Sequence, residues 1–133
     1  MKVLLVIFIL FSNLVNAEVI DIDNRELTNL IEKGIKIVDV RTQIEWNSTG
    51  IIKGSELISL LDKNNKFIFE NWYRAFNKKL NKDKSIIFIC AAGVRSNYIS
   101  HLVKRRKPDL KIYNLEKGIN HWIRSGNKIY KFK

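Results

Sequence analysis

The stretch from Ser85 to Cys90 constrains the fold more than any other part of the chain. After Ser85 come four consecutive apolar residues, Ile86-Ile87-Phe88-Ile89, and then Cys90. A strand with one face in water alternates apolar and polar residues, whereas an unbroken apolar run suits a strand that is covered on both faces. Such a strand is typical of the centre of a parallel sheet. The run therefore predicts an α/β fold with Cys90 at the end of a buried strand.

The pattern on either side of this run agrees with that fold class. Strands are expected at residues 19–22, 35–40, 56–61, 85–90 and 111–114, and helices at 23–34, 66–80, 95–106 and 116–124. In the first helix, Leu27, Leu30 and Ile31 follow the i, i+3, i+4 spacing of a helix face. The alternation predicts an α/β fold with a central parallel five-stranded sheet that is flanked by helices on both faces.

The first 17 residues differ from the rest of the chain. Lys2 is their only charge, an apolar run extends from Val3 to Phe11, and small or short side chains lead up to Ala17. This layout predicts a signal peptide over residues 1–17 and export to the periplasm. The apolar run is shorter than the roughly 20 residues of a membrane-spanning helix, although retention as an uncleaved anchor stays open. Without that segment, no stable association with a membrane is expected.

The remaining residues, 18–133, are expected to form a single domain. Of the chain's 133 residues none belongs to a repeat, a low-complexity stretch or a proline-rich linker. The chain has one cysteine, which excludes an intramolecular disulfide framework and a cysteine-rich zinc site. In an oxidising compartment such a cysteine is a reactive group or part of an intermolecular disulfide. Export also makes nucleic acid an unexpected partner, and the oligomeric state stays open.

The chemistry is concentrated in the segment that follows the central strand. Its residues are Cys90, Ala91, Ala92, Gly93, Val94, Arg95 and Ser96. Ligands of parallel sheets bind beyond the carboxyl ends of the strands, and a tight strand-to-helix loop can turn its N–H groups toward an anion. Gly93 supplies the backbone freedom that such a loop needs. A cysteine sulfur surrounded by the N–H groups of such a loop is favoured as thiolate. The alternative is that Cys90 has no chemical role and only packs in the core.

Five motifs in this order resemble the rhodanese family of sulfurtransferases. They are Ile37–Arg41, Glu45-Trp46, Gly50–Ser55, Cys90–Arg95, and Leu115–Gly118 with Trp122. The resemblance extends over about residues 18–128 and indicates a single-domain member.

The resemblance implies a sulfurtransferase without a metal or another cofactor. Cys90 would take sulfane sulfur from thiosulfate or polysulfide and become a persulfide, with the N–H groups of residues 91–96 around its outer sulfur. A thiophilic acceptor (cyanide, a thiol or a partner protein) would then remove that sulfur. Asp39, Arg41 and Glu45 would support the loop. Arg95 would either contact the bound anion or pair with Glu45 or Asp39.

Loop length separates the chain from the nearest relatives of that family. Cysteine phosphatases and arsenate reductases have five residues between cysteine and arginine, whereas four residues separate Cys90 from Arg95. Two departures from the family also stand out. Ile51 occupies a position where histidine is usual, and Ala91 occupies one where many users of thiosulfate have a cation. The alternative is therefore a catalytically weak rhodanese-like module that binds a partner protein or relays sulfur to it.

The distribution of charge suggests how small anions reach the site. The formal net charge is +11, and residues 91–133 contain 11 basic and 2 acidic side chains. This excess predicts a positive field at the mouth of the site, which would steer sulfur anions toward Cys90. His101 and His121 are too scattered for a zinc signature and are expected to be ordinary helix residues.

Overall fold

The computed structural model describes residues 18–133 and contains one five-stranded sheet in the order β1-β5-β4-β2-β3, with every neighbouring pair parallel. The strands are β1 (Val19–Ile22), β2 (Lys36–Asp39), β3 (Glu56–Leu57), β4 (Ser85–Ile89) and β5 (Lys111–Leu115). The run of apolar residues therefore forms the central strand, β4. The expected α/β class is confirmed, and the predicted signal peptide lies outside the described residues.

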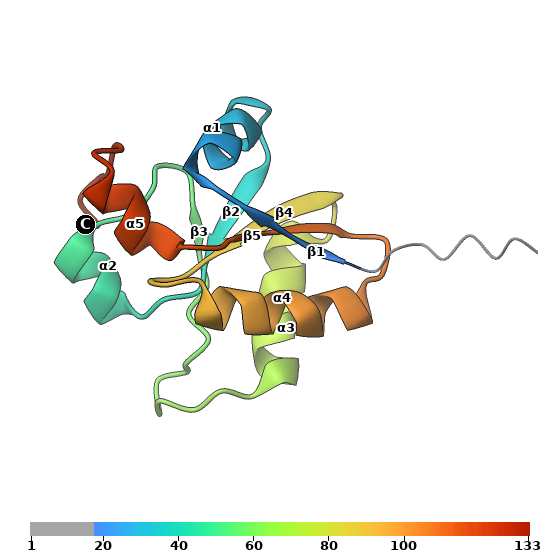
Figure 1. Cartoon of the computed structure of the whole chain (residues 1–133). Coiled ribbons are helices and arrows are strands. Elements are labelled where there is room, and N and C mark those ends of the chain that lie inside the picture. Colours follow the sequence, from blue (N-terminus) through green and yellow to red (C-terminus); the bar gives the residue numbers. More distant parts are fainter. Residues whose placement is uncertain (1–17) are drawn as a thin grey trace, which may run out of the picture.

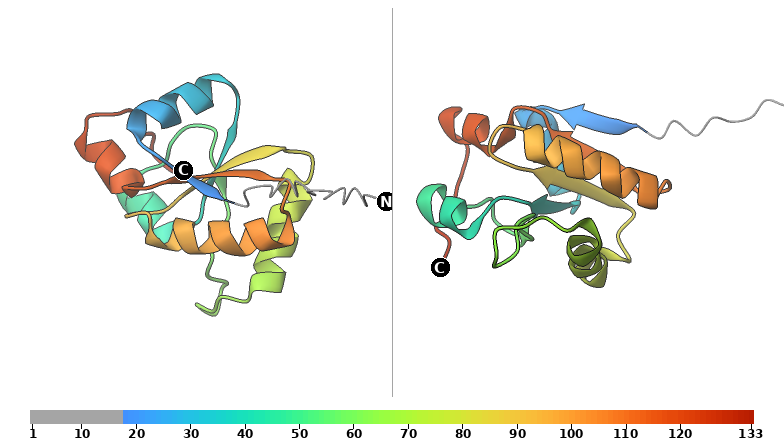
Figure 2. Two further views of the ribbon diagram at one scale, coloured as in Figure 1. Left: turned by 45° about the vertical axis from the view of Figure 1, so that its right-hand side comes forward. Right: turned by 90° about the horizontal axis from the view of Figure 1, so that it is seen from below.

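Helices cover both faces of the sheet. They are α1 (Asn24–Glu32), α2 (Gln43–Thr49), α3 (Phe69–Leu80), α4 (Val94–Arg106) and α5 (Gly118–Arg124). Figures 1 and 2 show α1 and α5 on one side of the sheet and α3 and α4 on the other, while α2 lies near the carboxyl ends of the strands. None of the helices within residues 18–133 combines the length and apolar character of a membrane span.

The side chains of β4 alternate between two cores. Ile86 and Phe88 pack with the aromatic rings of α3, where Trp72 and Phe76 stack with ring centroids 5.3 Å apart. Ile87 points to the other face and packs in a second core with residues of α1 and α5. Because both faces are buried, an unbroken apolar run is what this strand needs.

Two elements differ from the sequence prediction. Helix α2 was not predicted, although its start is a capping box in which Thr42 and Glu45 bond each other's backbone N–H groups. Trp46 is its single buried side chain, so hydrophobic periodicity could not reveal it. The strand predicted at residues 56–61 is regular only over Glu56–Leu57, although the N–H groups of Ile58 and Leu60 still donate to the carbonyls of Asp39 and Val40, each at 3.1 Å.

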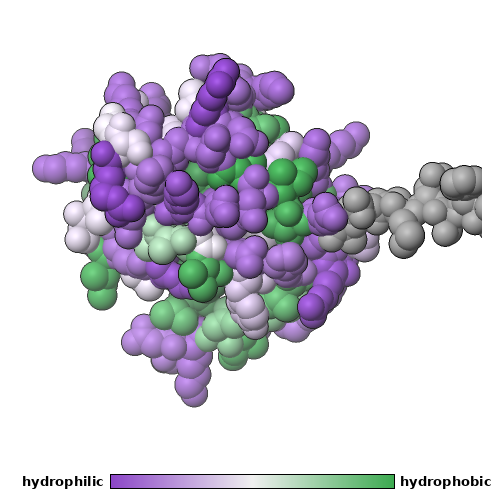
Figure 3. Space-filling view, in the orientation of Figure 1, coloured by the Kyte–Doolittle hydropathy of each residue, from purple (hydrophilic) through white to green (hydrophobic). Residues whose placement is uncertain are grey.

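The parallel topology places the chemically interesting segments together. Cys90 follows β4, and the ends of β2 and β5 lie on either side of it. Helix α4 starts beside this edge and runs toward the opposite edge of the sheet (Figure 2). The surface seen in Figure 3 is mostly hydrophilic, with apolar side chains in small separate groups. The carboxyl edge of the sheet is therefore where the site is built.

Burial on both faces of β4 predicts matched losses of stability. We expect Ile86→Val and Ile87→Val each to lower the free energy of unfolding by about 0.5–1.5 kcal/mol, since each removes a buried methyl group. Ile44→Val is the control because Ile44 is 80% exposed, and its effect should stay within about 0.5 kcal/mol. Denaturant unfolding measures all three. A loss for only one of the two buried residues would contradict the two-core arrangement.

Candidate functional site

Cys90 lies at the carboxyl end of β4 and is 1% exposed. Its Sγ accepts backbone N–H groups from Gly93 at 3.2 Å and from Ser96 at 3.3 Å. The hydroxyl oxygen of Ser96 lies 3.2 Å from the same sulfur. The loop thus curls around the sulfur, and two of its N–H groups point toward the place where negative charge would form.

Two glycines allow the loop to lie directly against the turn between β5 and α5. Gly93 has φ 88°, and a Cβ there would collide with the carbonyl oxygen of Glu116. Gly118 has φ 71°, and a Cβ there would collide with the carbonyl group of Ala91. The first turn of α5 then fixes the loop, because the N–H of Ile119 donates to the Cys90 carbonyl at 2.9 Å. Close backbone contacts therefore hold the loop against the turn between β5 and α5.

Arg95 pairs with Glu45 of α2. Its Nη1 and Nη2 donate to Oε2 at 2.9 Å and Oε1 at 2.7 Å, which is a bidentate geometry. The hydrogen bond from Arg95 is the main cause that lowers the pKa of Glu45 to about 2, and the N–H of Thr42 adds to it. The hydrogen bond with Glu45 likewise raises the pKa of Arg95. Arg95 was expected either to contact a bound anion or to pair with Glu45 or Asp39. The structure shows the pair with Glu45, which joins α4 to α2.

Asp39 and Arg41 form a buried ion pair at the end of β2. Arg41 Nη2 donates to Asp39 Oδ2 at 2.8 Å, and both side chains are at most 1% exposed. Arg41 also donates to the Thr49 hydroxyl at 2.7 Å and to the Gly50 carbonyl at 2.8 Å. The pair thus anchors α2, which carries Glu45, the ion-pair partner of Arg95.

Sequence reasoning missed a polar chain behind Ser96. The Ser96 hydroxyl donates to Asn114 Oδ1 at 2.6 Å, and Asn114 Nδ2 donates to Asp21 Oδ1 at 3.0 Å. Asn114 is 2% exposed on β5, so it is a polar residue within a buried strand. An asparagine within a buried strand was the signal in the sequence that could have indicated this polar chain, because buried polar side chains need hydrogen-bond partners.

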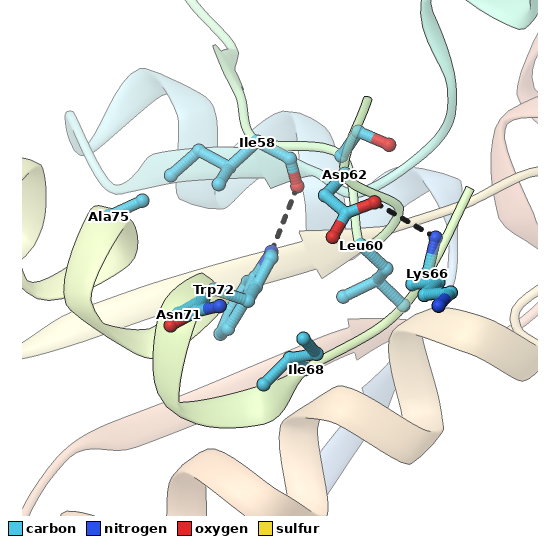
Figure 4. A pocket seen from close by; sticks show the side chains of 9 residues that line it. Ile58, Leu60, Asp62, Lys66, Ile68, Asn71, Trp72 and Ala75 are labelled. Carbon is cyan, nitrogen blue, oxygen red and sulfur yellow. Dashed lines mark hydrogen bonds between the residues drawn. The ribbon is translucent and has the colours of Figure 1, made fainter. Parts of the chain in front are cut away.

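Among the cavities near this edge of the sheet, two bear on the site. One, of about 290 Å³, lies beside the cysteine loop and is lined by Asp21, Ala92, Gly93, Val94, Asn97, Asn114 and Glu116. Another, of about 180 Å³, lies between the segment 58–68 and α3 (Figure 4). There Trp72 forms part of the wall and donates from Nε1 to the Ile58 carbonyl at 3.1 Å. Only the first cavity is lined by residues of the cysteine loop.

Five of the 11 basic residues that follow Cys90 lie away from the sulfur. Lys104, Arg105, Arg106 and Lys107 lie at the end of α4, and Lys111 begins β5. Because α4 has 13 residues, that end is about 20 Å along the axis from its start beside Cys90. These five cations therefore lie away from the sulfur, and the predicted positive field depends on the other basic residues after Cys90.

The two histidines lie on α4 and α5, as the sequence indicated. Within residues 18–133, no group of three or more histidine, cysteine, aspartate or glutamate side chains is arranged to hold a metal ion.

The lowered pKa of Glu45 predicts a specific dependence of stability on pH. The ion pair with Arg95 stabilises the fold above pH 4.5, the ordinary pKa of the carboxyl, and this contribution is lost as the pH falls toward about 2. We expect Glu45→Gln to be less stable than the wild type at neutral pH and to lose less stability on acidification. Denaturant unfolding between pH 2 and pH 7 measures both. Parallel pH profiles for the two proteins would contradict the assignment.

Comparison with protein families gives one match. The model of the rhodanese-like domain matches residues 23–125, which is most of the chain. A comparison with curated proteins finds no match.

Solved structures share the fold. A rhodanese-related protein of Thermoplasma volcanium is 28% identical with a TM-score of 0.63, and the match covers 84% of this chain and 97% of that one. A rhodanese-like domain protein of Staphylococcus aureus is 24% identical with a TM-score of 0.64, over 86% and 99%. The reduced CoADR-RHD protein of Bacillus anthracis is 23% identical with a TM-score of 0.66 over 84% of this chain, which spans only 18% of that protein.

Proposed function

The chain belongs to the family of rhodanese-like domains, and from this premise we propose that it is a sulfurtransferase with Cys90 as nucleophile and sulfur carrier. The observation that supports this most is the pair of backbone N–H groups, from Gly93 and Ser96, that point at the Cys90 sulfur. Donors fixed in this way stabilise negative charge on sulfur without having to reorganise during the reaction.

In the first half-reaction, the Cys90 thiolate attacks the outer sulfur of thiosulfate. A bond forms between the two sulfurs, the S–S bond of thiosulfate breaks, and sulfite leaves with the electron pair. The product is a Cys90 persulfide whose outer sulfur is anionic. A polysulfide donor reacts in the same way and leaves shortened by one sulfur. The N–H groups of the loop are suited to hold the anionic outer sulfur.

In the second half-reaction, an acceptor attacks that outer sulfur. Cyanide forms a C–S bond, the persulfide S–S bond breaks, and thiocyanate leaves while Cys90 returns as thiolate. Because the donor product departs before the acceptor reacts, ping-pong kinetics are expected.

The surroundings of the sulfur bear on the choice of donor. Ala91 provides no cation next to Cys90, and the guanidinium of Arg95 is engaged by Glu45. A thiosulfate dianion would therefore lack a free cation of the loop as partner. The absence of a free cation supports polysulfide, or a persulfide carried by a partner protein, as the sulfur donor at least as well as it supports thiosulfate.

Loop size supports sulfur transfer over phosphoryl chemistry. With four residues between Cys90 and Arg95, the loop is one residue shorter than a phosphatase loop needs to enclose a tetrahedral oxyanion. Arg95 also pairs with Glu45, whereas a phosphate group would need that guanidinium.

Sulfur loading is the direct test of this proposal. After incubation with thiosulfate or polysulfide, we expect the intact mass to increase by one sulfur atom and to return to its starting value with a thiol reductant. Cys90→Ser is the matched control and should gain nothing, since the chain contains no other cysteine. If neither donor adds sulfur to the folded wild-type protein, the enzyme proposal fails and a binding module remains.

We also propose that residues 1–17 direct export to the periplasm and are removed. The prediction is that the chain recovered from the periplasm of an expressing bacterium begins at Glu18 and has the mass of residues 18–133. Replacing Val6 and Leu10 by lysine interrupts the apolar run and should keep the chain in the cytoplasm. Recovery of the full-length wild-type chain from the membrane fraction would instead indicate a retained anchor.

A further inference from the structure

The polar chain from Asp21 to Cys90 fixes the direction of each hydrogen bond. The Asp21 carboxylate can only accept, so it faces the amide nitrogen of Asn114. The amide oxygen of Asn114 then faces Ser96, and an amide oxygen also only accepts. The single hydroxyl proton of Ser96 is therefore given to Asn114.

This assignment leaves an oxygen lone pair of Ser96 facing the sulfur. The distance of 3.2 Å between Ser96 Oγ and Cys90 Sγ is a hydrogen bond only if the S–H group of a thiol donates it. For a thiolate, the same contact would bring two lone pairs together. A hydrogen bond made by the neutral form favours that form over the anion.

Burial makes this orientation effective. Ser96 is 0% exposed and Asn114 is 2% exposed, so water does not compete for the inner members of the chain. Asp21 is exposed and lines the cavity beside the loop, and its hydrogen bond with the Asn114 amide nitrogen keeps that amide from turning over. The short contact of 2.6 Å between Ser96 and Asn114 holds the hydroxyl away from the sulfur.

We propose that Asn114, oriented by Asp21, is a positioning residue that holds the Ser96 hydroxyl away from Cys90 and keeps the resting cysteine as a thiol. Once the sulfur is anionic, the hydroxyl turns from Asn114 to the sulfur and becomes a third donor beside the N–H groups of Gly93 and Ser96. The thiol proton leaves to solvent base, and Ser96 keeps its own proton throughout. The Ser96 hydroxyl thus has two positions that follow the charge on sulfur.

Other charged groups also act on this sulfur. Arg95 on α4 interacts electrostatically with Cys90 and with Asp39 at the end of β2, while Glu45 on α2 offsets part of its charge. Arg41 neutralises Asp39 within the buried pair. Variants of Ser96 and Asn114 leave all of these groups in place.

The test follows the ultraviolet absorbance of the thiolate during a pH titration, with Cys90→Ser as the blank. Asn114→Leu removes the acceptor and frees the Ser96 hydroxyl to donate to the sulfur. We expect its titration midpoint to lie about one pH unit below that of the wild type, a tenfold change in the thiolate to thiol ratio. The same shift should appear for Asn114→Leu in a Ser96→Thr background, because the hydroxyl is retained.

In a Ser96→Ala background, Asn114→Leu should leave the midpoint unchanged, since the group through which Asn114 acts is gone. This comparison separates positioning from a general loosening of the fold, which would shift the midpoint in both backgrounds. A shift of equal size with and without Ser96, or no shift in either, would overturn the proposal.

If Asn114→Leu does not fold, variants of the exposed Asp21 decide. Asp21→Ala releases the Asn114 amide and should lower the titration midpoint of Cys90. The expected shift corresponds to an increase of about twofold to threefold in the ratio of thiolate to thiol. Asp21→Asn also removes the charge but keeps an oxygen that accepts from Asn114, so its shift should be smaller. Equal shifts would assign the effect to charge alone and overturn the proposal. The meaning for catalysis rests on the proposed sulfur transfer, but the titration needs no donor, so either can fail independently.

Discussion

The site depends on the direct contact between two backbone segments, the loop after β4 and the turn after β5. Gly93 and Gly118 make this contact possible because a Cβ at either position would collide with a carbonyl group across the contact. The contact positions the loop so that its N–H groups converge on Cys90. The ion pair between Arg95 and Glu45 adds a brace from α2, on the other side of the loop.

Two opposing influences meet at the Cys90 sulfur. The N–H groups of the loop favour an anion, whereas the chain through Ser96, Asn114 and Asp21 favours a thiol. A cysteine sulfur that stayed fully ionised would be prone to oxidation. A cysteine sulfur without hydrogen-bond donors to stabilise its thiolate would react slowly. In the proposed cycle, the hydroxyl of Ser96 turns to the sulfur only after negative charge has formed there.

Local patterns in the sequence were sufficient to predict the parallel sheet and the position of Cys90 at the end of its central strand. The apolar run before Cys90 predicted the central strand, since burial on both faces leaves a clear trace in the sequence. Helix α2 buries only Trp46 and left no such trace. The contact between Asn114 and Asp21 joins residues 93 positions apart, so only the pairing of β1 with β5 reveals it. The direction of α4, which places its basic end away from the sulfur, likewise cannot be read from the order of residues.

A single-turnover experiment tests most directly whether Cys90 is a covalent sulfur carrier. The protein is loaded with thiosulfate or polysulfide, freed of donor by gel filtration, and then mixed with cyanide. We expect one equivalent of thiocyanate per loaded cysteine, with the unmodified mass of the protein restored. Thiocyanate that forms only while donor and cyanide are present together would contradict a persulfide intermediate.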